Sequence, residues 1–516
     1  MRSNLTSLLH CLRRDFPVKL FLLLMFFYFV VRAYLLSITH DEALTVFSVV
    51  SNSYLHILLF KTPHPANNHL LNSLLVKFFI SIFGYRELPI RLAGLLGGLL
   101  YLFAAYKLCQ KLFSKTFLFY LCLLVLVLNP FVIDFFSLAR GYSLALGFLM
   151  LSIFYFFNSC SAADPQKALI FRIKSFCLMS LAVISNFSFL NVYFALMGSY
   201  CIMEYIMLYS LKEKGVRVKL FNHYFLINLF YIFVITIGLS ALIYLPLSEI
   251  AKYNLFYGGN TGFYHDTIGS LIKSSAYGKI YFGYITETYF GLFLLFVAML
   301  FFINFAFIFY KKRCLSSFDK DLIVIGSIIV ITVLSIVFQN TLLNTPFVLA
   351  RAAIYFIPLF TLLVFVLWKA ISKNGFRMII VPNIILVFCV IVGLLHYLSC
   401  INLSHTYDWR YDASTKTVMN YIFEMEQKIS PRIDKLTIGA TWWLVPAINY
   451  YLLKHGGHFK IVEPMGPETF GPDGQFDFYY LYEYDKTLLK KYNLSLLGHY
   501  TLSDTYLGVS NALMSK

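Results

Sequence analysis

Residues 16–43 read FPVKLFLLLMFFYFVVRAYLLSITHDEA, an apolar run that ends in two neighbouring acidic residues, Asp41 and Glu42. The run is long enough to cross a bilayer, which takes about 20 residues of helix. Carboxylates at a membrane boundary lose much of their hydration, so a pair of them is costly unless something uses it. Two interpretations stay open: capping and solvation of a helix end, or a catalytic base beside a helper carboxylate.

The composition is that of a polytopic membrane protein. Of the 516 residues 59% are hydrophobic and 13% are charged, whereas a soluble domain has about 25% charged residues. A net charge of +17 would suggest a nucleic-acid partner in a soluble protein. Here the basic residues gather in short segments between apolar runs, as the positive-inside rule expects, so no nucleic-acid partner is predicted. The nine cysteines contain no CxxC pair, and neither a disulfide framework nor a thiolate metal site is indicated.

Eleven apolar segments predict an all-α membrane region of about eleven transmembrane helices. Basic residues before the first segment place the N-terminus in the cytoplasm, and eleven crossings then leave the C-terminus outside. The expected spans are 16–38, 88–108, 116–133, one from about 140 that ends before 167, two within 175–210, then 223–245, 285–309, 321–338, 352–371 and 378–400.

Three further segments complete the predicted organisation. Leu70 to Phe83, inside the external loop 39–87, is expected to form one or two helices in the membrane interface. Pro246 is expected to open a second external loop to about 283, whose length and glycine content suit a mobile lid. Residues 401–516 lack apolar spans. They predict a small extracytoplasmic α/β domain, with helices near 413–428 and 443–454 and strands near 435–439, 459–462 and 476–482.

Most polar groups that are costly in a membrane protein fall on the predicted outer side. They are Asp41, Glu42, Arg91, Arg140, Tyr142, Lys273, Lys279 and Arg351. Acidic and basic groups gathered on one side suit a reaction in which a phosphate leaving group is held near a general base. Arginine binds phosphate bidentately and stays charged in a dry site. For any single arginine, snorkelling or positioning of a helix end is an equal alternative.

The order of these motifs resembles the GT-C glycosyltransferases, particularly the lipid A aminoarabinose transferases and protein O-mannosyltransferases. The resemblance covers residues 38–160 and, loosely, 340–370. It is carried by Asp41-Glu42, Arg91-Leu92, Asn129-Pro130, Ala139-Arg140-Gly141-Tyr142, and Ala350-Arg351 with Tyr355-Phe356-Ile357-Pro358. The chain departs from the family pattern before the interfacial helix, where His-Pro-Pro is frequent. It reads Asn68-His69-Leu70 there, with His64-Pro65 four residues earlier.

The resemblance implies an inverting glycosyltransferase at the outer face of the cytoplasmic membrane. A sugar would move from a polyprenyl-phosphate donor to a hydroxyl of a lipid, glycan or protein acceptor. Asp41 would be the general base and Glu42 would orient the acceptor or tune Asp41. Arg140 and Arg351 would bind the donor phosphate, and Tyr142 and Arg91 are further candidates for that site. Lys273 and Lys279, in the loop after Pro246, and His69 are candidates for contacts with the substrate. For His69 the alternative is a loop histidine that makes a hydrogen bond. Because the external loops contain no Asp-x-Asp, the enzyme is expected to need no metal and no cofactor.

Two other function classes stay open. A transporter or flippase for a lipid-linked glycan would usually place its charges near the membrane midplane, in paired halves with broken helices. A non-catalytic scaffold of the same fold would not need both Asp41 and Glu42. The sequence leaves the sugar and the acceptor undetermined.

Overall fold

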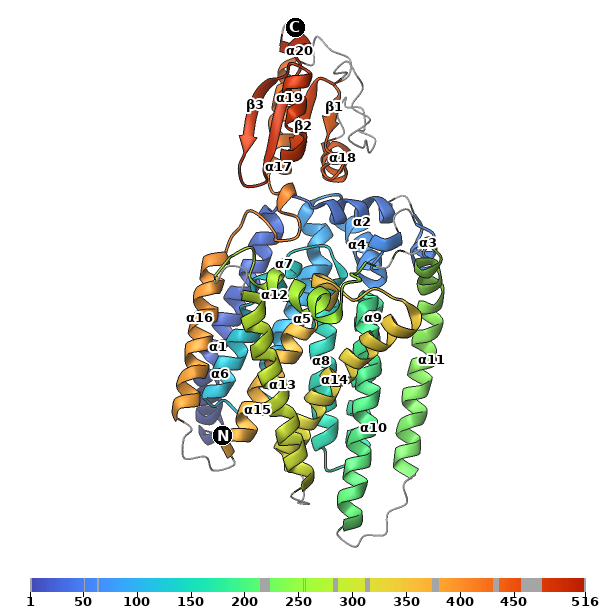
Figure 1. Cartoon of the computed structure of the whole chain (residues 1–516), viewed down its shortest axis with the longest axis vertical. Helices are drawn as coiled ribbons and strands as arrows, with labels where there is room; N and C mark the ends of the chain where they lie inside the picture. Colours follow the sequence, from blue (N-terminus) through green and yellow to red (C-terminus); the bar gives the residue numbers. More distant parts are fainter. Residues whose placement is uncertain are drawn as a thin grey trace.

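The computed structural model describes residues 2–50, 52–62, 65–213, 223–253, 255, 257–281, 286–310, 316–373, 380–429, 436–455 and 476–514. Long helices form a bundle, and a small sheet domain lies over one of its ends (Figure 1). The long helices are α1 (Arg2–Leu35), α5 (Glu87–Phe113), α8 (Gly141–Ser161), α9 (Pro165–Ser185), α10 (Leu190–Glu213), α11 (His223–Lys252), α13 (Thr286–Tyr310), α14 (Ser317–Leu343), α15 (Phe356–Lys373) and α16 (Ile380–Cys400).

The bundle confirms a polytopic membrane fold, and each predicted span has a helical counterpart. Among the described residues nine helices are long and apolar enough to cross a membrane. A tenth is counted if α6 (Phe117–Val127) and α7 (Pro130–Phe136), which meet at a 63° bend, make one span. The remaining predicted span corresponds to α15, whose apolar part, Phe356–Ser372, is shorter than the others. The bend falls at Asn129-Pro130, where the Asn129 side chain caps α7 by accepting from the Val132 amide at 3.1 Å.

Two predicted boundaries were wrong. The helix expected from residue 175 begins at Pro165, because Asp164 caps it and proline is well tolerated at a first helical position. Its charged residue Arg172 is accommodated by an ion pair with Glu204 of α10 at 3.3 Å. Pro246 does not open a loop, since α11 runs through it to Lys252. In apolar surroundings a helix is the way to satisfy the remaining backbone groups, so one lost hydrogen bond is tolerated.

Short elements lie across the end of the bundle under the sheet domain (Figure 1). The predicted helix at Leu70–Phe83 is present as the single helix α4. The helices α2 (His40–Val50) and α3 (Tyr54–Leu58) pack against it, and η3 (Phe263–Gly269), α12 (Ser270–Ser275) and η4 (Ala350–Ala353) form a second group of short elements that contact one another. Asp41 and Glu42 lie on α2, Lys273 on α12 and Arg351 on η4.

The C-terminal segment folds as the predicted α/β unit. Its elements are α17 (Thr415–Ile429), β1 (Ile438–Ala440), α18 (Val445–His455), β2 (Phe478–Tyr482), α19 (Thr487–Lys491), β3 (Ser495–Tyr500), β4 (Thr505–Val509) and α20 (Asn511–Met514). The strand order is β1-β2-β4-β3, with β1 parallel to β2 and the other pairs antiparallel. The strands β3 and β4 were not predicted, and the strand expected at 459–462 lies outside the described residues.

The sheet domain and the layer beneath it share one hydrophobic core. Ile38, just before α2, and Ala43 and Val46 within it belong to the same buried cluster as Val418 of α17 and Tyr451 of α18. The C-terminal domain therefore packs directly on the stretch that carries the acidic pair.

Candidate active site

The acidic pair sits in the first turn of α2, where a local motif fixes its orientation. Thr39 and Glu42 form a reciprocal pair: Glu42 Oε2 accepts from the Thr39 amide at 3.0 Å, and Thr39 Oγ1 accepts from the Glu42 amide at 3.4 Å. This is the Thr-x-x-Glu capping box. Because successive side chains on a helix point about 100° apart, Asp41 is directed away from Glu42.

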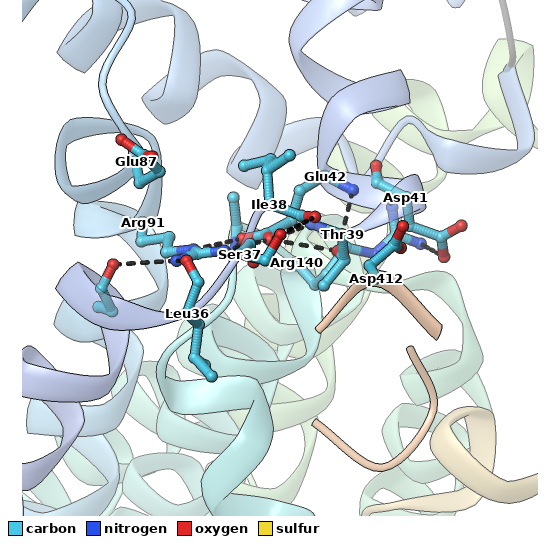
Figure 2. Close-up of polar contacts among 12 residues, drawn as sticks. Leu36, Ser37, Ile38, Thr39, Asp41, Glu42, Glu87, Arg91, Arg140 and Asp412 are labelled. Atoms are coloured by element: carbon cyan, nitrogen blue, oxygen red, sulfur yellow. Dashed lines mark hydrogen bonds and ion pairs between the residues drawn. The ribbon is translucent and has the colours of Figure 1, made fainter. Parts of the chain in front are cut away.

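Glu42 is held by a buried ion pair with Arg91. Both side chains are fully buried, and Arg91 donates to Glu42 through Nε at 2.8 Å and Nη2 at 2.7 Å. The other Arg91 hydrogen bonds go to the carbonyls of Ala33, Leu36 and Ser37. Glu42 also accepts from the Ala139 amide at 2.7 Å. Figure 2 shows Glu42 turned to Arg91 and Asp41 turned away, toward Arg140.

This geometry corrects the roles expected for Arg91 and Glu42. An arginine has five N–H donors, and those of Arg91 are all engaged within the protein. With 0% of its surface exposed, Arg91 has no donor left for a substrate phosphate. Glu42 is likewise enclosed, so it does not face an acceptor. The pair instead joins α1, α2 and α5.

Asp41 faces two arginines from distant parts of the chain. Its Oδ2 lies 3.2 Å from Arg140 Nη2 and 3.5 Å from Arg351 Nη2. Arg140 comes from the start of α8 and Arg351 from η4, so the fold brings together three residues that the sequence selected. A second carboxylate, Asp408, lies 3.2 Å from Arg351 Nη1. Two guanidinium groups and two carboxylates thus form one compact cluster.

The charges in this cluster alter the proton affinities of its members. Burial alone would raise the pKa of Asp41, but Arg140 and Arg351, helped by His40 and a hydrogen bond from Trp409, lower it below its usual value. Burial raises the pKa of Asp408, with Arg351 opposing and Asp41 adding to the rise. Asp41 is therefore ionised and Asp408 is the more readily protonated of the two.

Aromatic rings fix the Arg351 guanidinium in place. Its carbon lies 5.0 Å from the Tyr257 ring centre and 4.9 Å from that of Trp409, both within cation–π range. The preceding residue, Ala350, has a φ of 39°, a left-handed conformation that is costly for alanine. Its amide donates to Ser270 Oγ at 2.8 Å, which holds this turn against α12.

His69 and Tyr142 pack against each other beside the charged cluster. Their rings are 5.2 Å apart in an edge-to-face arrangement, and His69 Nε2 is buried with no hydrogen-bond partner in the described part of the chain. Burial, with the charges of Arg140 and Arg351, keeps the pKa of His69 well below its usual value. Gly141 permits this packing, because a Cβ there would lie 2.8 Å from the His69 Cβ and 2.0 Å from the Ser185 carbonyl oxygen.

The structure of ArnT from Cupriavidus metallidurans bound to undecaprenyl phosphate is similar to this chain over its length. It matches with a TM-score of 0.53 and 13% identity, covering 97% of this chain and 99% of that one. The chain has a GT-C fold. The same ArnT in the apo state has a TM-score of 0.44 and 12% identity, covering 97% and 99%. An Archaeoglobus fulgidus oligosaccharyltransferase in complex with Zn and sulfate has a TM-score of 0.41 and 13% identity, covering 89% and 67%. No protein-family model and no curated protein matches the sequence.

Within this GT-C fold, the two lysines expected in a substrate loop are not brought to the cluster. Lys273 is 57% exposed at its side chain and pairs with Glu287 at 3.0 Å. Lys279 is exposed, and among the described residues no ion pair joins it to the cluster. His64, the other histidine near the interfacial helix, lies outside the described residues.

Sequence reasoning missed the part of the site that follows the last span. Asp408 and Trp409 lie in the segment that leads from α16 to the C-terminal domain, and no motif marks them. Asp412, in the same segment, accepts from the His40 amide at 2.6 Å. The sequence offered one indication of this part of the site: two aspartates, Asp408 and Asp412, follow closely after the last predicted span.

The described ranges contain no group of three or more His, Cys, Asp or Glu side chains placed to hold a metal ion. The expectation that the protein works without a metal stays a prediction.

Proposed function

We propose that the protein is a membrane glycosyltransferase that moves a sugar from a polyprenyl-phosphate donor to an acceptor hydroxyl, with inversion at the anomeric carbon. The observation that carries this proposal is the convergence of Arg140 and Arg351 on the Asp41 carboxylate. The undecaprenyl phosphate in the structure of the similarly folded ArnT supports a donor of this class.

The residues suit the reaction in which a phosphate departs from the sugar. Asp41 takes the proton of the acceptor hydroxyl while that oxygen bonds to the anomeric carbon and the bond from that carbon to the phosphate oxygen breaks. General-base assistance of this kind is worth typically about 10²- to 10⁴-fold. Arg140 and Arg351 hold the polyprenyl phosphate and stabilise the negative charge that it gains. The packed rings of Tyr142 and His69 would line the site beside the two arginines.

Donor binding would also activate the base. In the free protein both arginines depress the pKa of Asp41, and a carboxylate of low pKa is a weak base. A phosphate between the arginines would neutralise part of their charge and release Asp41 from these ion pairs. The pKa of Asp41 would then rise, so the base would become stronger only when the donor is in place.

Binding of undecaprenyl phosphate to the purified protein in nanodiscs tests the donor site. We expect Arg351→Ala and Arg140→Ala to weaken binding at least tenfold, because each removes a charge-assisted phosphate contact. Arg410→Ala is the matched control, since Arg410 is exposed and donates only to the Leu502 carbonyl among the bonds described. Equal binding by all four proteins would contradict the assignment and favour a transporter or scaffold with another lipid site.

A further inference from the structure

The C-terminal domain presents a group of four aromatic side chains close to the Asp41 cluster. This aromatic surface consists of Trp442, Trp443, Tyr482 and Tyr484. The Trp443 ring centre lies 5.3 Å from that of Trp442 and 5.9 Å from those of both tyrosines. Tyr482 and Tyr484 are 5.4 Å apart. The four rings therefore make one continuous surface.

Two of these rings are open to solvent. Trp442 is 44% exposed and Tyr484 is 46% exposed, and both rings pack against Trp443, which lies between them in this chain of contacts. They belong to the loop before α18 and the turn after β2, in the extramembrane domain, so lipid tails do not account for their exposure. Large exposed aromatic groups in such a position mark a binding surface.

The aromatic surface is joined to the proposed base through two residues. His40, which precedes Asp41 in the chain, packs its ring edge-to-face against Trp442 at 6.2 Å, and its Nδ1 lies 2.8 Å from the Trp443 carbonyl oxygen. Tyr411 packs against Trp443 at 5.5 Å. A molecule lying on these rings would therefore have one end beside Asp41.

We propose that the aromatic surface binds the sugar rings of the acceptor, so that the acceptor is a glycan. This inference rests on the proposed transferase function. A pyranose ring presents a face of C–H groups, which carry partial positive charge and are attracted to the negative face of an aromatic ring. Its edges carry hydroxyls, which match the tyrosine hydroxyls and the nearby carboxylates. A peptide acceptor would be expected at an unpaired strand edge, and an acyl chain in an apolar groove, rather than on flat rings with polar edges.

Binding of defined oligosaccharides to the full-length protein in nanodiscs tests this inference. The probes are chitohexaose, mannohexaose and maltohexaose, with a serine- and threonine-rich peptide and phosphatidylglycerol vesicles for comparison. We expect at least one oligosaccharide to bind saturably, and Trp442→Ala or Tyr484→Ala to weaken it at least tenfold. Trp442→Phe keeps a ring and should retain most of the binding. Tyr421→Ala, which removes a 37% exposed tyrosine from α17, is the control and should bind normally.

The result that overturns the inference is binding of no oligosaccharide, or equal binding by Trp442→Ala and wild type. Peptide or vesicle binding that depends on Trp442 would overturn it as well. Asp41→Asn separates this inference from the proposed function. If Asp41→Asn binds the oligosaccharide but no longer transfers sugar, both stand. If Asp41→Asn loses transfer while no oligosaccharide binds, the glycan-binding surface is rejected and the proposed transferase function is retained. If Asp41→Asn transfers sugar normally while oligosaccharide binding still depends on Trp442, the glycan-binding surface is retained and the role of Asp41 as the base is rejected.

Discussion

At the level of single residues, the neighbouring carboxylates of Asp41 and Glu42 differ in their partners: Asp41 faces Arg140 and Arg351, and Glu42 is paired with Arg91. The pKa of Asp41, the proposed base, is lowered by the two arginines against the effect of burial. A depressed pKa keeps Asp41 ionised, and active as a base, to a pH below its usual titration range. We therefore expect the acid limb of kcat/KM, which reports the free enzyme, to lie below the ordinary aspartate pKa. The acid limb of kcat, which reports the donor complex, should lie at higher pH. Identical limbs in a pH–rate profile would contradict the coupling of donor binding to base strength.

Glu42, by contrast, stabilises the fold through its buried ion pair with Arg91. Glu42→Gln leaves Arg91 as a buried cation with a neutral partner, and breaking such a pair costs about 3–5 kcal/mol. Thermal unfolding in detergent should show a large loss of stability. Glu483→Gln makes the same chemical change at an exposed pair with Lys486 and should leave the unfolding temperature unchanged. A Glu42→Gln protein of normal stability but without activity would return Glu42 to the catalytic machinery.

At the scale of elements, the turn before α8 depends on a close approach that a side chain would block. In Gly141→Ala the new Cβ would lie 2.0 Å from the Ser185 carbonyl oxygen. The backbone must therefore shift, at a cost of about 1–3 kcal/mol, and Arg140 moves with it. We expect weaker undecaprenyl phosphate binding and a lower unfolding temperature. Gly238→Ala in α11 has no atom within 4 Å and should be neutral or stabilising by up to about 1 kcal/mol. Equal behaviour of the two variants would contradict the packing argument.

The elements also show why part of the site was predictable. Asp41, Arg140 and Arg351 each lie at the end of an apolar run, and ends of runs on one side of a membrane fall in one layer. The apolar runs and the charges therefore placed them on one side, and the resemblance to the GT-C glycosyltransferases suggested their roles. The pairing of Arg91 with Glu42 depends on how α5 packs against α1 and α2. This packing cannot be derived from a single sequence. The continuation of α11 through Pro246 is likewise decided by its apolar surroundings, against the local preference of proline.

At the scale of the whole molecule, the C-terminal domain completes the site. The segment that leads into it from α16 supplies Asp408 and Trp409, and also Asp412, which accepts from the His40 amide in the first turn of α2. These long-range contacts carry no sequence motif, so this half of the cluster was missed although the domain and its α/β class were predicted. The shared hydrophobic core explains why the two parts meet at the acidic pair.

The junction between the two parts should respond to pH through Asp412. Burial raises the pKa of Asp412 well above its usual value, against a hydrogen bond from the His40 amide and with Asp41 and Glu42 adding to the rise. A raised pKa gives stability at low pH that is lost as the pH rises toward the folded-state pKa. Asp412→Asn, which mimics the protonated carboxyl, should therefore gain stability over wild type as the pH rises. Unfolding temperatures at pH 5 and pH 8 check this, and a difference that does not change between them would contradict it.

The role of Asp41 is tested most directly in cells that lack the chromosomal copy of the protein and carry either wild type or Asp41→Asn at equal expression. Mass spectrometry of surface lipids, polysaccharides and exported proteins identifies any sugar that depends on it. If Asp41 is the general base, wild type restores this sugar and Asp41→Asn does not. Restoration by both proteins would contradict Asp41 as the base and leave a transporter or scaffold as the better explanation.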